Sequence, residues 1–417
     1  MKTNITLLLQ LVFLCLAVTL PAQAVQIWKL KSPGKGSVSY DPAGMSSDGN
    51  FLAFTAVTYE GPNYMVLDVR DKAKPLDLSK IAPERANALV FHPQKPLLAV
   101  VPEKGSEPIR IIDLEQKKVE VYLPKIKRRA FGGSDLYFHP DGNRLWVLSD
   151  ATLTLYDIKT QASEITVRLA QSAPNAYMTS FAQHPEARLG VVIVHENRKD
   201  QNHYRLLLLD FESRKVMELD EQTFPEDQGV WTKSAFLDHG GLYYSIYNQT
   251  TKHVKVYTWE PGNFIQKKVT TLPNCRFPAI SSDGNYLAAM LQKTEYSAAL
   301  CVQNLHTGRL DTLDEWGVDA HRLDFFPGGS CLFLNSYNPM LYDLVEGKFH
   351  ELSGRDQESS GPLQFAGYRE RDGRFFIWNS YFDESTLYVY SGWPDFPAFG
   401  QRVKGSPTTT PKDPPSA

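Results

Sequence analysis

Short apolar runs and polar turns alternate along nearly the whole chain, and one such unit occurs eight times. In each unit an apolar strand ends in a polar turn, often with Asp-Gly, and a second apolar strand follows at once. Helical periodicity longer than about two turns is absent, so the pattern predicts an all-β fold. The eight turns lie at residues 47–49, 92–95, 139–142, 184–186, 238–241, 282–284, 327–329 and 371–373.

The spacing of these turns averages about 46 residues, close to the repeat length of β-propeller blades. A unit of this size cannot bury its own apolar face, so it must stack on its neighbours. A second marker, a strand end with an apolar–acidic or similar pair, keeps the same phase. These pairs are Leu67-Asp68, Ile112-Asp113, Tyr156-Asp157, Leu209-Asp210, Trp259-Glu260, Gln303-Asn304, Tyr342-Asp343 and Tyr390-Ser391.

The two markers together predict an eight-bladed β-propeller, with seven blades as the alternative. The last unit contains three clear strands, and a fourth after Gly392 is doubtful. The strand Val25–Leu30 precedes the first unit and has no blade of its own. We therefore expect it to pair as the outer strand of the last blade and close the ring.

The two ends of the chain differ from the repeats. Residues 1–24 read as a signal peptide, with a basic start, an apolar run from Ile5 to Leu20, and small residues at Ala22 and Ala24. A membrane anchor is the alternative, but roughly 16 apolar residues are short for a span. We expect one propeller domain over residues 25–400, a disordered tail over 401–417, and a periplasmic or secreted location.

At the turns the chain resembles exported bacterial propellers of the WD-repeat and TolB-like kind. The resemblance rests on Ser46-Ser47-Asp48-Gly49-Asn50-Phe51-Leu52-Ala53-Phe54 and on Ser281 to Ala288, and it covers about residues 25 to 400. It implies a propeller and no particular activity. The chain departs from TolB-like proteins in having no α/β domain before the ring, and it lacks the Gly-His pair common in WD repeats.

Several classes of propeller enzyme need motifs that this sequence does not contain. A Gly-x-Ser-x-Gly nucleophile elbow, which propeller-containing serine peptidases need, is absent, as is the Cys-x-x-Cys-His motif for covalent haem. Quinone-dependent dehydrogenases have tryptophan motifs in every blade, whereas the 7 tryptophans here do not follow the repeat. The net charge of −3 favours neither nucleic acid nor an anionic membrane. We expect no cofactor, no metal site, no membrane span and a monomer.

Histidine and cysteine are interpreted as structural. His92, His139 and His184 recur at one position of the repeat, where we expect them to bond nearby backbone. Cys275, Cys301 and Cys331 remain after signal cleavage, and an exported chain could pair two of them. Burial as small apolar residues is the favoured interpretation, and a disulfide remains open.

Candidate binding residues fall in two groups. Residues that open the first strands should face the channel mouth, and this set is basic and aromatic, which suits an anionic ligand or acidic peptide. The unit after Asp157 is also longer than its neighbours, and its excess forms a polar hairpin at 195–203 followed by a long connection at 220–231. Insertions of this kind often lie on a binding face. The mouth set is Asn87, Arg129, Tyr177, Lys233, Arg276 and His321, and the insertion contributes Arg198, Lys199, His203 and Trp231.

The sequence thus predicts an exported, non-enzymatic scaffold that binds a protein or peptide of the cell envelope through one loop face and the channel mouth. A lactonase-like hydrolase or lyase that acts on a small anionic substrate at the same mouth is the alternative. Three or more carboxylate, Asn or His groups that converge at the mouth would favour the enzyme.

Overall fold

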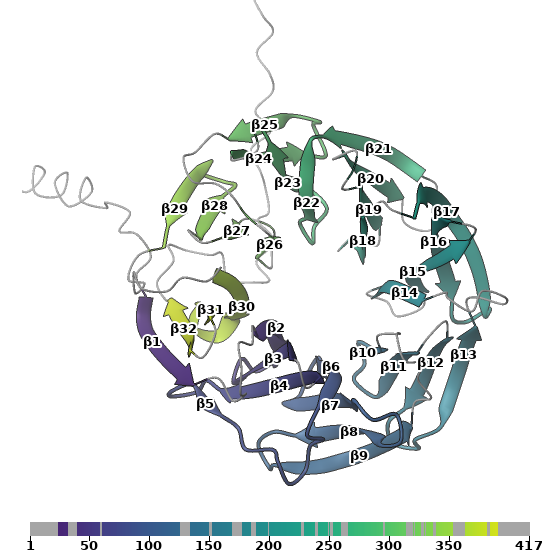
Figure 1. Cartoon of the computed structure of the whole chain (residues 1–417), viewed down its shortest axis with the longest axis vertical. Helices are drawn as coiled ribbons and strands as arrows, with labels where there is room; N and C mark the ends of the chain where they lie inside the picture. The colour runs from purple at the N-terminus through teal and green to yellow at the C-terminus, as the bar shows by residue number, and fades with distance from the viewer. Residues whose placement is uncertain are drawn as a thin grey trace, which may run out of the picture.

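The computed structural model contains eight four-stranded antiparallel sheets, which surround a central channel as the blades of a propeller (Figure 1). This confirms the predicted all-β fold and the blade count of eight. The structure describes residues 24–31, 40–58, 61–125, 134–149, 152–168, 177–184, 189–198, 200–226, 229–237, 241–248, 250, 253–259, 266–294, 297–313, 320, 322–326, 329, 331–336, 339–352, 363–381 and 384–390.

The first four blades each order their strands from the channel outward in chain order. Blade 1 contains β2 (Tyr40–Met45), β3 (Phe51–Thr58), β4 (Gly61–Asp68) and β5 (Lys74–Pro75). Blade 2 contains β6 (Ala86–Phe91), β7 (Leu97–Pro102), β8 (Pro108–Asp113) and β9 (Lys118–Lys125). Blade 3 contains β10 (Ser134–Phe138), β11 (Arg144–Ser149), β12 (Thr152–Asp157) and β13 (Ser163–Arg168). Blade 4 contains β14 (Tyr177–Gln183), β15 (Leu189–Arg198), β16 (Gln201–Asp210) and β17 (Lys215–Pro225).

Blades 5 to 7 follow the same order, and blade 8 takes its outer strand from the other end of the chain. Blade 5 contains β18 (Val230–Phe236), β19 (Leu242–Asn248), β20 (His253–Trp259) and β21 (Gln266–Pro273). Blade 6 contains β22 (Cys275–Ile280), β23 (Tyr286–Gln292), β24 (Ala298–Asn304) and β25 (Leu310–Leu313). Blade 7 contains β26 (Arg322–Phe325), β27 (Cys331–Asn335), β28 (Met340–Asp343) and β29 (Lys348–Glu351). Blade 8 contains β30 (Leu363–Arg369), the 3₁₀ turn η1 (Glu370–Asp372), β31 (Arg374–Tyr381), β32 (Glu384–Tyr390) and β1 (Ala24–Lys31).

The ring closes through the pairing of β1 with β32, as the sequence predicted. The register runs antiparallel from Ala24 opposite Tyr390 to Lys31 opposite Glu384. Leu30 is buried there, and Trp28 packs against the same apolar cluster. The first strand therefore covers the edge that blade 8 would otherwise leave open.

The apolar core is distributed between the blades rather than within them. Eight clusters of buried residues occur in the part of the chain that the structure describes, and each joins two neighbouring blades. The cluster that contains Leu30 joins blade 8 to blade 1, where the rings of Phe54 and Trp378 lie 4.2 Å apart. Each blade is thus stabilised by both of its neighbours.

The repeated Asp-Gly turn is held by the blade that precedes it. Gly142 has a φ of +71°, which favours glycine, and a Cβ at this position would lie 2.4 Å from Cε1 of His92. Nε2 of His92 donates to the carbonyl oxygen of Gly142 at 2.9 Å, and its Nδ1 accepts from the backbone N–H groups of Gln94 and Lys95. The predicted structural role of this histidine is confirmed.

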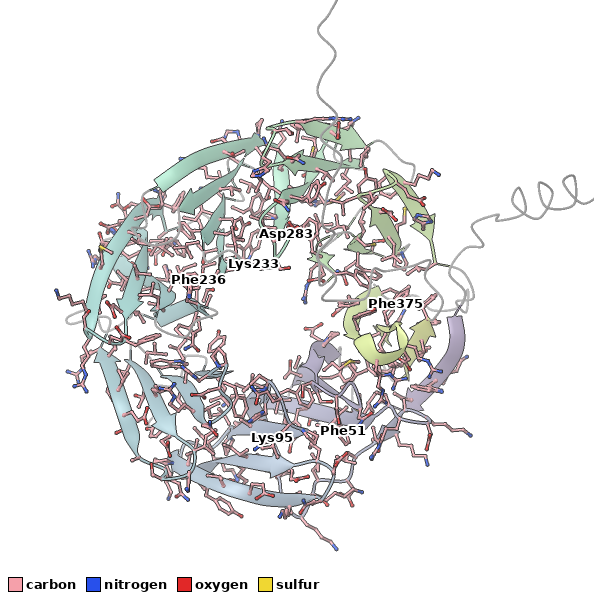
Figure 2. All side chains as sticks on the ribbon, turned by 180° about the vertical axis from the view of Figure 1, so that it is seen from behind. Phe51, Lys95, Lys233, Phe236, Asp283 and Phe375 are labelled. Carbon is pink, nitrogen blue, oxygen red and sulfur yellow. The ribbon has the colours of Figure 1, made fainter. Side chains whose placement is uncertain are left out.

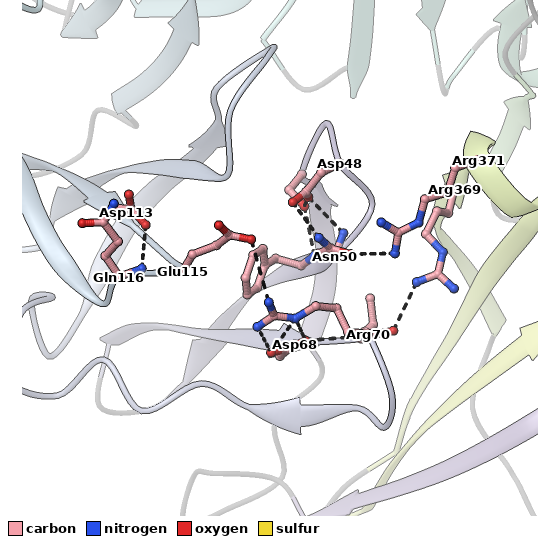
Figure 3. A network of polar contacts seen from close by, with 12 residues as sticks. Asp48, Asn50, Asp68, Arg70, Asp113, Glu115, Gln116, Arg369 and Arg371 are labelled. Atoms are coloured by element: carbon pink, nitrogen blue, oxygen red, sulfur yellow. Dashed lines mark hydrogen bonds and ion pairs between the residues drawn. The ribbon is translucent and has the colours of Figure 1, made fainter.

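Arg369 occupies the equivalent position between blade 8 and blade 1. Its side chain is 3% exposed, pairs with Asp372 at 2.7 Å, and donates to the carbonyl oxygen of Val69. A Cβ on Gly49, the glycine of the blade 1 turn, would lie 2.5 Å from Cγ of Arg369. Figure 3 shows Arg369 and Arg371 reaching from the last blade to the first, where Arg371 donates to Asn50 at 2.7 Å. Polar contacts beside the turns therefore join the last blade to the first, in addition to the apolar contacts in the core.

The acidic residue of the second sequence marker stabilises the outer hairpin of its blade. Oδ1 of Asp113 accepts from the backbone N–H of Gln116, and Oδ1 of Asp157 accepts from that of Thr160. Asn304 does the same with its amide oxygen. The marker recurs because it terminates the third strand and fixes the turn that follows.

The three cysteines that the structure describes are buried and form no disulfide, which confirms their structural interpretation. Cys275 and Cys301 lie on β22 and β24, the two strands that flank β23. Strands in these positions are about 10 Å apart, whereas a disulfide needs Cα atoms within roughly 7 Å. A hydrogen bond with the Cys301 side chain, followed by burial, raises the pKa of Cys275, so this thiol stays protonated.

Blade 4 confirms one sequence prediction and corrects another. The polar residues at 195–203 form the expected hairpin, in which β15 continues to Arg198 and β16 begins at Gln201. The expected long connection at 220–231 is instead mostly strand, since β17 continues to Pro225. The inserted residues lengthen the three paired strands β15, β16 and β17. In this arrangement the backbone N–H and C=O groups of the insertion find hydrogen-bond partners in the sheet.

None of the helices that the structure describes is long and apolar enough to cross a membrane. The predicted signal peptide, apart from Ala24, and the predicted tail lie outside the described residues.

Deleting residues 24–31 should lower the melting temperature by roughly 10 °C, because β32 loses its partner and the apolar contacts of Leu30 and Trp28 are worth several kcal/mol. Truncation after Gly405 is the control and should leave the melting temperature unchanged. Calorimetry of the two variants measures the difference, and equal effects would contradict closure by the first strand.

His92→Ala should lower the free energy of unfolding at neutral pH by about 1–3 kcal/mol, since three hydrogen bonds are lost. Burial lowers the pKa of His92, so its contribution is complete above the usual histidine pKa near 6.5 and is lost as the pH falls through the lowered value. Urea unfolding of both proteins from about pH 7 to 5 should show the difference shrinking. His306→Ala, at an exposed hairpin, is the control, and a difference that widens in acid would refute this role of His92.

Candidate functional site

Two kinds of connection emerge on one face of the propeller, which we name the pocket face. They are the hairpins between second and third strands and the links from a fourth strand to the next first strand. The tip of the blade 4 hairpin meets such a link: the N–H of Glu226 donates to the carbonyl of Asp200 at 3.1 Å, and Asn202 donates to the carbonyl of Glu226 at 3.2 Å. The two inserted segments therefore cluster, as the sequence predicted. The opposite face carries the Asp-Gly turns and is named the turn face.

A pocket of about 320 Å³ lies on the channel side of blades 5, 6 and 7. Its aromatic wall comes from Trp231 on β18, Tyr247 on β19 and Phe277 on β22, with Pro278 and Leu323 beside them. Trp231 and Tyr247 stack, with ring centroids 5.3 Å apart and planes 4° apart. Trp231 is nevertheless 55% exposed, so one face of this pair remains open to a ligand.

Phe277 reaches the pocket through an irregularity in its strand. Between Arg276 and Ala279 the pairing of β22 with β23 shifts register, so Phe277 and Pro278 together oppose Ala289. Phe277 has a φ of +54° and is the only aromatic residue with a positive φ among those that the structure describes. Such a conformation costs about 1–3 kcal/mol and is commonest at binding and catalytic sites.

Two cations line the same pocket. Lys233 lies at the inner edge of the ring (Figure 2), and Arg322 opens β26. Nε of Arg322 donates to Asp324 at 2.9 Å, and Asn335 donates to the other oxygen of Asp324 at 2.8 Å. Asp324 is thus already engaged, and no carboxylate lines the pocket itself in the part of the chain described.

The surroundings of Lys233 depress its pKa. Desolvation by the protein around the channel is the main cause, repulsion from Arg322 adds to it, and Asp324 opposes it. The residue is nevertheless exposed to solvent by its surface area, so a ligand can reach it. A lysine of this kind gains from an anionic ligand, which would restore its charge.

The inserted residues of blade 4 are occupied in their own sheet. Glu196 is 2% exposed and lies between Arg198 and Arg205, with which it forms close ion pairs. Nδ1 of His203 pairs with Glu221 at 3.0 Å. The charge of Arg198 is therefore compensated within the hairpin, and the ring of His203 already has a partner there, so neither side chain is free to form an anion site.

The other predicted binding residues, from the mouth and from the insertion, have different outcomes. The structure places Lys233 and Trp231 in the pocket, and Arg276 lies 5.2 Å from the ring centroid of the adjacent Phe277. Asn87 lies in blade 2 and donates to the carbonyl of Glu103 at 3.5 Å, away from the pocket. Tyr177 begins β14, but its side chain lies outside the described part, as do Arg129, Lys199 and His321.

Arg322, Tyr247 and Phe277 were not predicted from the sequence. Arg322 directly follows the predicted His321, and Phe277 directly follows the predicted Arg276, so the error was one position in each strand. The register shift beside Phe277 has no sequence signal that we recognise. Tyr247 lies on a second strand, and its stacking on Trp231 depends on the pairing of β18 with β19.

Among the described residues, one group has the ligand types and spacing for a metal ion, and it lies outside the pocket. Asp343, Glu346 and His350 offer ligand atoms within 4.8 Å of one another on the outer hairpin of blade 7. Oδ1 of Asp343 already accepts from the N–H groups of Val345 and Glu346, which accounts for this arrangement as turn chemistry. The converging carboxylate, Asn or His groups that would favour a hydrolase are not found around the pocket in the described residues.

No protein-family model matches the chain. No curated protein matches its sequence either. Among solved structures, the fold is similar to Sqt1 from Chaetomium thermophilum, with a TM-score of 0.58 and 14% identity over 89% of this chain and 99% of that chain. A prolyl endopeptidase has a TM-score of 0.52 and 11% identity over 82% of this chain and 54% of its own.

A structure described as the eukaryotic initiation factor has a TM-score of 0.50 and 14% identity over 84% of this chain and 89% of that chain. At these identities the likeness shows the propeller fold alone. The same fold therefore occurs in proteins with very different names, and function has to be argued from the site.

Lys233 should react faster with an acylating reagent at about pH 8 than Lys118, because its lowered pKa leaves more neutral amine. Lys118 is a suitable comparison, since its side chain is exposed on the outer strand of blade 2. Mass spectrometry of partially acetylated protein measures both rates. A Lys233 rate that rises only near pH 10 would contradict the lowered pKa.

Proposed function

We propose that this chain is an exported, non-enzymatic propeller scaffold that binds a protein or peptide partner through its pocket face. The observation that carries the proposal is the pocket of blades 5 to 7, where an open aromatic pair lies beside two cations with no carboxylate in its described lining. Such a combination favours binding of an apolar group with a negative charge. The rigid hairpin of blade 4 stands on the same face and would enlarge the contact surface.

The cellular setting is part of the proposal. The resemblance of the Ser46–Phe54 turn to exported TolB-like propellers and the amino-terminal pattern support a periplasmic or secreted scaffold in the cell envelope. The near-neutral net charge is in keeping with a protein partner rather than nucleic acid. Because the ring closes on itself, it needs no second copy to complete a blade, which supports a monomer.

A hydrolase or lyase acting on a small anionic substrate is the second candidate, and one observation favours it. Lys233 has a lowered pKa and lies beside Arg322, so a neutral amine could accept a proton from a substrate whose carboxylate the arginine holds. Binding without turnover is the simpler proposal, because no carboxylate, histidine or cysteine lines the pocket among the described residues.

The double variant Trp231→Ala, Lys233→Met should reduce capture of the partner by about tenfold or more, because it removes the open ring and the positive charge. Immobilised protein is incubated with solubilised cell envelope, and retained proteins are quantified by mass spectrometry. Lys95→Met, on the turn face, is the matched control and should capture the partner like wild type. Retention that is equal for all three proteins would contradict the role of the pocket face.

A further inference from the structure

The two cations of the pocket converge from different blades. Lys233 comes from the first strand of blade 5 and Arg322 from the first strand of blade 7. Asp324 contacts Nε of Arg322, and among the described residues no acceptor lies on its two Nη groups. Likewise no described carboxylate pairs with Lys233. The pocket can therefore receive an oxyanion between the two side chains.

The rest of the pocket is apolar and half open. The Trp231–Tyr247 pair and Phe277 offer ring faces to a side chain, and Pro278 and Leu323 complete the surface. A volume of about 320 Å³ is at the lower end of the range for ligand pockets. The pocket therefore has room for a single residue or a small molecule, and not for a peptide segment that passes through it. The exposure of Trp231 leaves an exit from the pocket across the face.

Resting on the proposed function, we propose that this pocket captures the carboxyl terminus of a partner polypeptide. The terminal carboxylate lies between Lys233 and Arg322, and the last side chain, apolar or aromatic, packs on Trp231 and Phe277. Only a terminal residue places a main-chain carboxylate directly next to such a side chain, and the preceding residues leave across the pocket face. Capture of a chain terminus is a recurring mode of peptide recognition.

The test uses hexapeptide pools with a fluorescent label, mixed residues at the first five positions and a fixed last residue. Full-length protein is titrated into pools that end in Phe, Leu or Ser, each as the free acid and as the amide, and binding is followed by fluorescence anisotropy. We expect the Phe and Leu acids to bind about tenfold to a hundredfold more tightly than their amides, and the Ser acid about tenfold more weakly than the Phe acid.

Variants assign the effect to residues. Lys233→Met should weaken binding of the Phe acid toward the level of its amide and leave the amide unchanged, with Arg322 retaining part of the difference, whereas Trp231→Ala should weaken both. Lys118→Met and Tyr122→Ala are matched controls on the outer strand of blade 2, where Tyr122 is 52% exposed, and they should bind like wild type. Circular dichroism establishes that each variant is folded.

Equal affinities for acid and amide would overturn the inference. So would competition by N-acetylphenylalanine at the same affinity as the peptide, which would assign the pocket to small carboxylates. If the pools do not bind but the captured partner still depends on Trp231 and Lys233, the terminal-carboxylate inference fails while the proposed function stands. If capture of the partner also does not depend on Trp231 and Lys233, both the terminal-carboxylate inference and the proposed function fail.

Discussion

A blade of this propeller has two apolar faces and cannot cover either of them by itself. Every buried cluster therefore forms between neighbours, and the constraint is satisfied only when the last blade meets the first. The pairing of β1 with β32 meets this requirement in the sheet, and Arg369 meets it on the turn face by occupying the space above Gly49. The pairing of β1 with β32 joins the two ends of the described chain, and Arg369 is the counterpart at the closing blade of His92 in blade 2.

The candidate site arises where the repeat is least regular. Blade 6 bends at the register shift before Ala279, which turns Phe277 toward the channel, and blade 5 adds the stacked pair of Trp231 and Tyr247. Blade 7 contributes Arg322 at the start of a short first strand. The ring places side chains from three successive blades around one pocket. The regular ring thus determines where the pocket residues lie, and the irregular parts of blades 5 to 7 provide its aromatic and charged side chains.

Much of the fold could be predicted because its signals are local. The Asp-Gly turns and the strand-end pairs have direct roles, since Gly142 needs its left-handed conformation and Asp113 fixes the hairpin that follows it. The first strand was predicted to close the ring from simple counting of strands. Lys233 could be placed at the channel mouth from the phase of the repeat, and Trp231 was predicted as a binding residue from the long connection at 220–231.

The remaining features depend on contacts between blades, which the sequence does not display. The polar residues near 195–203 predicted a hairpin, but their composition did not show that Glu196 is buried between two arginines or that β17 continues to Pro225. Phe277 reaches the pocket only because the backbone adopts a conformation that its residue type disfavours. Predicting Arg322 as a pocket residue would have required knowing at which residue the first strand of blade 7 begins.

The closure of blade 8 by β1 also constrains how the chain can fold. Residue 24 pairs with residue 390, so the two partners are separated by nearly the full length of the propeller. Contacts of such sequence separation slow folding, because a long loop must be closed before the contact forms. During synthesis the first strand has no partner until the last blade has emerged. Any factor that protects this strand in the meantime would govern the yield of native protein.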